Sequence, residues 1–182
     1  MNKNLYSVIT TLIVLGATAQ SVPVLANENE PAPFKIGQIH KDAVHEEVLI
    51  KATPQVVWES MLRQRKLDPD SQYCKSVGQP GTPLVEQKFK FPSPFGAAEC
   101  ILHLSETPAE RVDFRLIESE ELKKMEGYWV LTPVDNGQST KLGLCSYVEP
   151  NIALPRIVTN GIISHKAKKN LAMVKKLAEK SM

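Results

Sequence analysis

Six short runs of alternating apolar and polar residues constrain this chain more than any other feature of its sequence. A period of two places every second side chain on the same face of a β-strand. The connections between the runs are short and rich in Gly, Pro, Asn and Asp, which favours hairpins between antiparallel neighbours. We therefore predict an antiparallel meander with strands at 72–78, 84–91, 98–106, 110–118, 124–132 and 140–148.

The two faces of this meander differ in polarity. One face is expected to be wet, and its residues are Glu86, Lys88, Lys90, His103, Arg111, Asp113 and Arg115. The other face is apolar, and its residues are Phe89, Phe91, Cys100, Leu102, Leu104, Val112, Phe114, Leu116, Trp129, Leu131, Leu142 and Leu144. An antiparallel sheet with one solvated face must bury the other, so a cover is required.

A long C-terminal helix is the expected cover. No proline follows Pro155, and apolar residues recur there at near-helical spacing. A helix of about 25 residues is almost 40 Å long, which is enough to cross a sheet. Its polar face is rich in lysine, which is typical of a solvated surface and also suits contact with an anionic membrane. The lysines are Lys166, Lys168, Lys169, Lys175, Lys176 and Lys180.

The chain before the meander supplies one strand and a helical region. Residues 44–50 alternate in polarity, and Thr53 followed by Pro54 is typical of a helix N-terminus. We expect two short helices there, the second within 63–70, where a turn is the alternative because the stretch ends in Asp68-Pro69-Asp70. Residues 27–42 mix prolines and charges with few apolar groups, so we expect a flexible leader and place the start of the domain at residue 43.

The first 26 residues have the pattern of a secretory signal. Lys3 is followed by an apolar run over 8–19, and Val24-Leu25-Ala26 offers small residues at the cleavage positions. The run is shorter than the roughly 20 residues that span a bilayer. We expect cleavage after Ala26 and a periplasmic or secreted protein.

Composition excludes several classes of protein. With 42% hydrophobic residues, 23% charged residues and a net charge of +2, the chain fits neither a disordered nor a polytopic membrane protein, and no case for nucleic-acid binding follows. Cys74, Cys100 and Cys145 allow at most one disulfide within a monomer, and their pairing is left open. Cys100 alternates with leucines, which favours a buried thiol.

Local patterns add to this order of elements. They are Val48-x-Ile50-x-Ala52-Thr53-Pro54-x-x-Val57-Trp58, Gly127-Tyr128-Trp129-x-Leu131-x-Pro133, Thr140-x-Leu142, and Pro150 with Leu154-Pro155 before the last helix. In this order they resemble the START-like superfamily, also called SRPBCC or Bet v 1-like, over about residues 44–180. The resemblance implies an α+β helix-grip fold, with a curved sheet of about seven strands around the C-terminal helix. One difference lies at 63–70, which reads Arg-Gln-Arg-Lys-Leu-Asp-Pro-Asp.

The resemblance also implies a cavity for an apolar ligand, such as a lipid, between sheet and helix. The candidate lining residues serve equally well as ordinary core. They are Phe89, Phe91, Leu102, Leu104, Phe114, Leu116, Trp129, Leu131, Leu144, Ile157 and Gly161.

No catalytic motif stands out in the sequence. The four histidines have no zinc-ligand spacing, and phosphate-loop, dinucleotide and nucleophile-elbow patterns are absent. We therefore expect no metal or cofactor and assign no catalytic residue. The favoured hypothesis is an exported carrier for a hydrophobic small molecule. The alternatives are an enzyme of the cyclase or aromatase type and an interaction module without a cavity.

Overall fold

The computed structural model describes residues 31–78, 81–93 and 96–180. The predicted signal segment, residues 1–26, lies outside this range. Within the described residues, seven strands form one antiparallel sheet in the order β1-β7-β6-β5-β4-β3-β2. The strands are β1 (Val44–Ile50), β2 (Ser71–Ser76), β3 (Leu84–Ser93), β4 (Gly96–Thr107), β5 (Arg111–Glu118), β6 (Leu122–Val134) and β7 (Ser139–Pro150). The predicted meander is confirmed, and a 3-10 turn, η1 (Asp135–Gly137), joins its last two strands.

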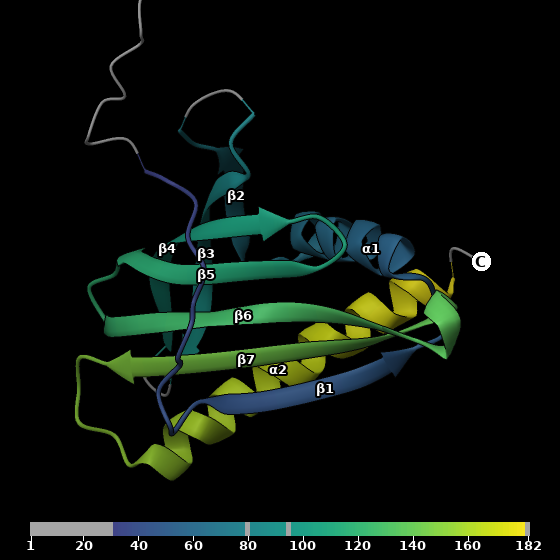
Figure 1. The fold of residues 1–182 in the computed structure, drawn as a ribbon. Coiled ribbons are helices and arrows are strands. Elements are labelled where there is room, and N and C mark those ends of the chain that lie inside the picture. The colour runs from purple at the N-terminus through teal and green to yellow at the C-terminus, as the bar shows by residue number, and fades with distance from the viewer. Residues whose placement is uncertain (1–30, 79–80, 94–95, 181–182) are drawn as a thin grey trace, which may run out of the picture.

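The long C-terminal helix α2 (Arg156–Glu179) crosses one face of the curved sheet, as predicted (Figure 1). The residues that it buries recur every three or four positions, which places them on one side of the helix. They are Thr159, Ile163, Lys166, Ala167, Leu171, Val174 and Ala178. The apolar side chains of this stripe join those of the inner sheet face in one hydrophobic core.

One helix, not two, follows the first strand. Helix α1 (Pro54–Leu67) begins with Pro54 after an extended Thr53 and continues through Arg63. The expectation of a second short helix within 63–70 is therefore wrong, because no helix-breaking residue occurs before Pro69; the alternative expectation of a turn is met at Pro69 and Asp70. The backbone of Asp68 is extended, as the following proline demands, and this ends the helix.

An N-terminal strap, residues 31–42, lies on the outer face of the sheet (Figure 1). The Phe34 amide donates to Ser105 Oγ at 3.2 Å, and the Ile36 amide donates to Asp113 Oδ1 at 2.8 Å. Arg111 Nη2 donates to the Ile36 carbonyl at 3.0 Å. The described part of the predicted leader is thus attached to the domain.

The predicted wet face needs a correction at two residues, and the strap explains it for Asp113, which accepts from the Ile36 amide. His103 and Asp113 were assigned to solvent, yet their exposed fractions are 8% and 3%. The alternation that placed them on the outer face is correct. A sequence pattern identifies the face of a strand, but it does not show which distant segment covers that face.

All three cysteines are free thiols. Cys74 is exposed, whereas Cys100 and Cys145 are buried. Burial raises the pKa of the Cys100 thiol to about 11. In the part of the chain that the structure describes, no helix has the length and apolar character needed to cross a membrane.

Candidate functional site

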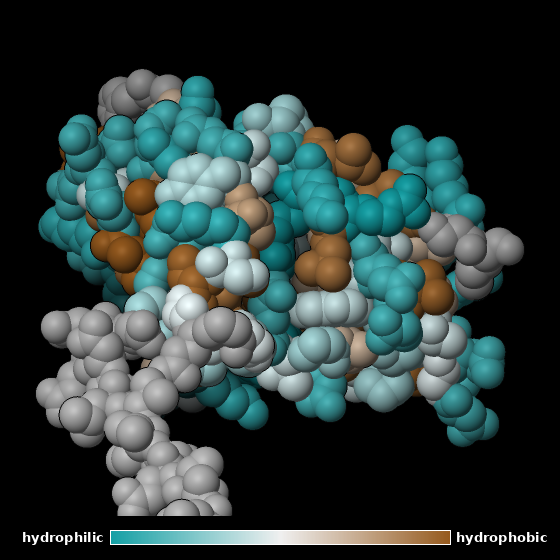
Figure 2. Space-filling view, turned by 90° about the horizontal axis from the view of Figure 1, so that it is seen from above, coloured by the Kyte–Doolittle hydropathy of each residue, from teal (hydrophilic) through white to brown (hydrophobic). Residues whose placement is uncertain are grey.

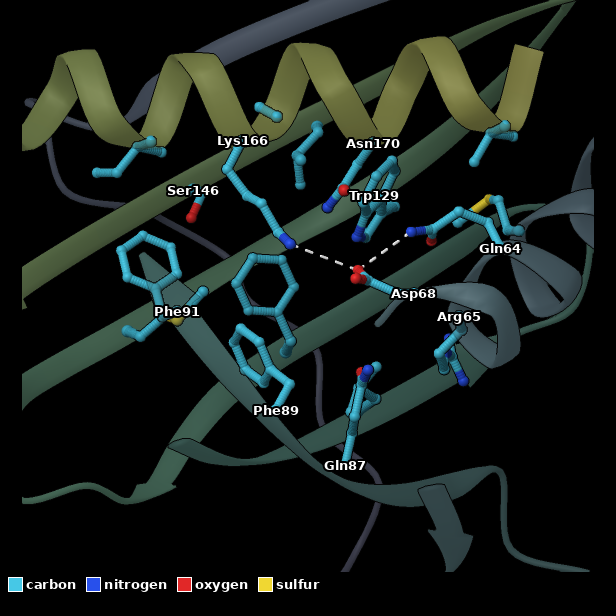
Figure 3. A pocket seen from close by; sticks show the side chains of 18 residues that line it. Gln64, Arg65, Asp68, Gln87, Phe89, Phe91, Trp129, Ser146, Lys166 and Asn170 are labelled. Carbon is cyan, nitrogen blue, oxygen red and sulfur yellow. Dashed lines mark hydrogen bonds and ion pairs between the residues drawn. The ribbon is translucent and has the colours of Figure 1, made fainter. Parts of the chain in front are cut away.

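A cavity of about 110 Å³ lies between the inner sheet face and the two helices, and we call it the inner cavity (Figure 3). Strand β3 contributes Phe89 and Phe91, β5 contributes Phe114, and β6 contributes Trp129. Its other lining residues are Met61, Gln64, Arg65, Asp68, Gln87, Leu104, Met125, Leu144, Ser146, Ile163, Lys166, Ala167, Asn170 and Val174. Figure 2 views the molecule from above the orientation of Figure 1. It shows a hollow near the middle of the visible surface, between mainly hydrophilic residues.

Strand pairing explains why this space is not filled. Phe89 and Phe91 stand opposite Cys100 and Ala98 on β4, and these small partners leave room beside the two rings. The rings meet edge to face with centroids 6.5 Å apart. At Gly127 of β6, an added Cβ would lie 2.5 Å from Cζ of Phe114, so only glycine lets this ring pack so closely against the strand.

Polar groups from both helices form one border of the inner cavity (Figure 3). Lys166 of α2 lies 2.5 Å from Asp70 Oδ2 and 3.5 Å from Asp68 Oδ2. Gln64 Nε2 donates to the same Asp68 oxygen at 3.3 Å. Gln64, Asp68 and Asp70 all come from the stretch 63–70, where the sequence differs from the resembled family.

Lys166 departs from the predicted solvated lysine face. Its exposed fraction is 8%, and its ammonium group pairs with two carboxylates instead of water. The neighbouring Arg65 pairs with Glu106 at 2.6 Å. Because these charges are compensated within the protein, the border is suited to orienting a ligand by hydrogen bonds.

A second cavity of about 290 Å³, the end cavity, lies near the N-terminus of α2. Phe91 lines both cavities. The other lining residues of the end cavity are Pro92, Glu120, Glu121, Leu122, Val148, Pro150, Asn151, Ile152, Leu154, Thr159 and Ile162. Most of these side chains are apolar.

The structure brings together about half of the predicted lining residues. Those that line the inner cavity are Phe89, Phe91, Leu104, Phe114, Trp129 and Leu144. Leu102, Leu116 and Leu131 pack in the core without lining it.

Ile157 and Gly161 were predicted to line the cavity, and the structure places both elsewhere. Ile157 is 84% exposed, and a Cβ on Gly161 would meet open space. Each lies two residues from the buried Thr159, which is about 200° around a helix. The sequence-based reading of α2 therefore had the wrong helical phase in its first turns.

Sequence reasoning missed the polar border and the end cavity. One signal for Lys166 was present, because it follows Ile163 by three residues and Ile162 by four, which places it on the apolar side of the helix. Within residues 31–78, 81–93 and 96–180, no group of three or more His, Cys, Asp or Glu side chains could hold a metal ion.

Neither a protein-family model nor a curated protein matches this sequence. Solved structures do match. A protein from Thermus thermophilus is 17% identical with a TM-score of 0.64, and the match covers 76% of this chain and 98% of that one. A START superfamily protein from Mycobacterium smegmatis is 15% identical with a TM-score of 0.62, over 77% and 99% of the two chains.

The Zhui aromatase/cyclase from Streptomyces sp. R1128 is 17% identical with a TM-score of 0.59, and the match covers 75% of this chain and 93% of the enzyme. At these identities the likeness concerns architecture. Together with the seven-stranded curved sheet and the helix across it, these matches show that the chain has the START-like, or SRPBCC, fold.

Proposed function

We propose that this protein binds a hydrophobic small molecule between the sheet and α2 and acts as its carrier. The observation that carries the proposal is the inner cavity, where four aromatic side chains face a space that the core leaves unfilled. A concave site with an aromatic wall on one side and polar groups that can orient a ligand on the other has the two elements of a small-molecule site. Lipid is one candidate class of ligand.

The test is displacement of the neutral fluorescent probe N-phenyl-1-naphthylamine. Trp129→Arg places a cation in the inner cavity and should weaken probe binding at least tenfold, because an unpaired charge is costly in apolar surroundings. Ile157→Arg is the matched control, since the same substitution on an exposed side chain should leave binding unchanged. Circular dichroism checks that both variants fold. Equal binding by both variants, or none by the wild type, would contradict the proposal.

Enzymatic activity of the cyclase type is the second candidate. The favouring observation is that Lys166, Asp68 and Asp70 bring ionisable groups to the border of the inner cavity. Titratable groups that converge in a pocket are typical of catalytic sites, although structural ion pairs also produce them. Incubation with a reactive poly-β-keto thioester, followed by mass spectrometry, separates the candidates: an enzyme releases water and a cyclised product, whereas a carrier returns its ligand unchanged.

We further propose export. Support comes from the charged start, apolar run and small residues of positions 1–26. The mature protein would then begin at Asn27. Intact-mass measurement of protein from an exporting host should give the mass of residues 27–182, and the full-length mass in the exported fraction would contradict this proposal.

A further inference from the structure

Ser146 interrupts the apolar row on the inner face of β7. Leu142, Leu144 and Val148 occupy this row and belong to the hydrophobic core. Because side chains two residues apart share a face of a strand, Ser146 lies in the same row. It lines the inner cavity, and its exposed fraction is 4%. A hydroxyl group buried so deeply among apolar side chains normally has a hydrogen-bond partner.

The described part of the protein gives this hydroxyl no partner. Ser146 Oγ forms no hydrogen bond with any described residue. The described side-chain atoms that are both unpaired and sealed from solvent are His103 Nδ1, Thr159 Oγ1 and Asn160 Oδ1. Ser146 Oγ is not one of these sealed atoms, so it keeps accessible surface. Because the residue is otherwise buried, that surface faces the inner cavity (Figure 3).

Thr140 shows how the same face of β7 satisfies a hydroxyl with a purely structural role. Thr140 is fully buried, and its Oγ1 donates to the carbonyl of Ala52 at 2.7 Å. The neighbours of Ser146 across the sheet are Gly127 on β6 and Val44 on β1, and neither has a side-chain acceptor. The hydroxyl of Ser146 is therefore free to donate to an acceptor that a ligand brings.

Lys166 directs a second donor into the same cavity from α2 (Figure 3). An ammonium group has three N–H donors. Among the described residues, the acceptors for Lys166 are Asp70 Oδ2 at 2.5 Å and Asp68 Oδ2 at 3.5 Å. One N–H of Lys166 therefore remains for a ligand, and the sheet and the helix each offer a donor to the inner cavity.

The ion pairs of the border limit the charge of the ligand. One ammonium group, that of Lys166, faces two carboxylates, which leaves one negative charge in excess. The charge of Arg65 is compensated by Glu106 at 2.6 Å. A carboxylate ligand would add a further negative charge to this border, and an ammonium ligand would be repelled by Lys166. An uncharged oxygen acceptor avoids both costs.

We propose that the ligand of the inner cavity is an apolar molecule with an uncharged oxygen acceptor, a ketone or alcohol oxygen, which accepts a hydrogen bond from Ser146 Oγ. Lys166 is the second donor to this end of the ligand. The apolar part packs against the rings of Phe89, Phe91 and Trp129. The inference rests on the proposed function, because it names the chemical class of the hydrophobic molecule that the protein carries.

The experiment compares three probes with one small ring, because a dry cavity of about 150 Å³ accepts benzene and the inner cavity measures about 110 Å³. Cyclohexanone carries the acceptor, and methylenecyclohexane has the same shape without it. Cyclopentanecarboxylate, at neutral pH, carries a negative charge. Affinities are measured by displacement of N-phenyl-1-naphthylamine, and the wild type should bind cyclopentanecarboxylate most weakly.

Ser146→Ala removes the donor. It should weaken the binding of cyclohexanone about fivefold, as the loss of one hydrogen bond predicts, and leave the binding of methylenecyclohexane unchanged. Ser146→Cys keeps a side chain of similar size but offers only a weak donor, so it should give the same pattern. Both variants should fold, because the hydroxyl has no partner in the described protein to lose, and circular dichroism checks this.

Thr140→Val is the matched control, because it removes a hydroxyl from the same strand face outside the inner cavity. It should lower stability and leave all three affinities unchanged. Unchanged cyclohexanone binding by Ser146→Ala, or an equal loss for both neutral probes, would overturn the inference. Tightest binding of cyclopentanecarboxylate would overturn it in favour of an acidic ligand. If N-phenyl-1-naphthylamine does not bind the wild type, the proposed function itself fails; if it binds and cyclohexanone does not displace it, only the inference fails.

Discussion

Replacing Lys166 by methionine tests whether the polar border of the inner cavity is a buried ion-pair system. Methionine keeps most of the length and apolar stem of lysine but removes the ammonium group. The change leaves Asp68 and Asp70 without the cation that lies 3.5 Å and 2.5 Å from their carboxylates. Gln64 Nε2, 3.3 Å from Asp68, would be the remaining side-chain donor to that carboxylate.

The expected loss follows from burial. Removing one partner of a fully buried ion pair costs about 3–5 kcal/mol, because it leaves an uncompensated charge. Asp70 is partly exposed and water can solvate it after the substitution, which reduces the penalty. We expect Lys166→Met to lower the free energy of unfolding by about 2 kcal/mol.

Urea denaturation monitored by circular dichroism measures this loss. Lys169→Met is the matched control, because Lys169 is exposed on the same helix and its loss should change stability by less than about 0.5 kcal/mol. Adding Asp70→Asn to Lys166→Met should recover part of the loss, since it removes one of the orphaned charges. The reasoning is refuted if Lys166→Met and Lys169→Met have the same stability.

Three further outcomes are expected. Iodoacetamide at pH 8 should label Cys74 in the folded protein and leave Cys100 unlabelled, because Cys100 is buried and burial raises the pKa of its thiol to about 11. The stability that comes from keeping this thiol neutral is present below the ordinary pKa of a thiol and is lost as the pH rises towards 11. Labelling of Cys100 as fast as Cys74 would contradict its buried position. Asp113→Ala removes the acceptor for the Ile36 amide and for Arg111, so it should cost about 2 kcal/mol and open the strap to limited proteolysis, whereas an unchanged digestion pattern would show that the strap is held otherwise. If the exposed lysines of α2 touch a membrane, the protein should sediment with vesicles containing phosphatidylglycerol and not with phosphatidylcholine alone, and charge reversal at Lys169, Lys176 and Lys180 should abolish sedimentation.

The sheet could be predicted from the sequence because alternation is a local property. Each strand of the meander carries its own period-two pattern, and short connections, most of them with Gly, Pro or Asn, separate it from the next strand. The face of Phe114 or Leu144 therefore follows from neighbours within a few residues. The length of α2 was predictable for the same reason, since its stripe repeats along the whole helix.

The site depends on contacts between distant residues, which no local pattern records. Asp70 and Lys166 are 96 positions apart in the chain, and Ile36 and Asp113 are 77 apart. Ile157 looked apolar enough for a core, but the phase of α2 at its first turns is set by how Thr159 and Ile163 meet the sheet. An unfilled cavity is likewise invisible in a sequence, because Phe89 has the same pattern whether a side chain or a ligand packs against it.

The inner cavity also implies a cost that ligand binding can offset. Volume left dry in a core destabilises a fold by roughly 24 cal/mol per Å³, so a volume of about 110 Å³ costs at most some 2–3 kcal/mol. A ligand present at about a hundred times its dissociation constant stabilises the folded state by about 2.7 kcal/mol. The cost of the empty volume and the stabilisation by a bound ligand are therefore of similar size. Ala167→Leu would fill part of the inner cavity, so we expect it to stabilise the protein without ligand and to weaken ligand binding. Ala167 of α2 lines the inner cavity, so its small side chain leaves part of the space that the proposed ligand would occupy.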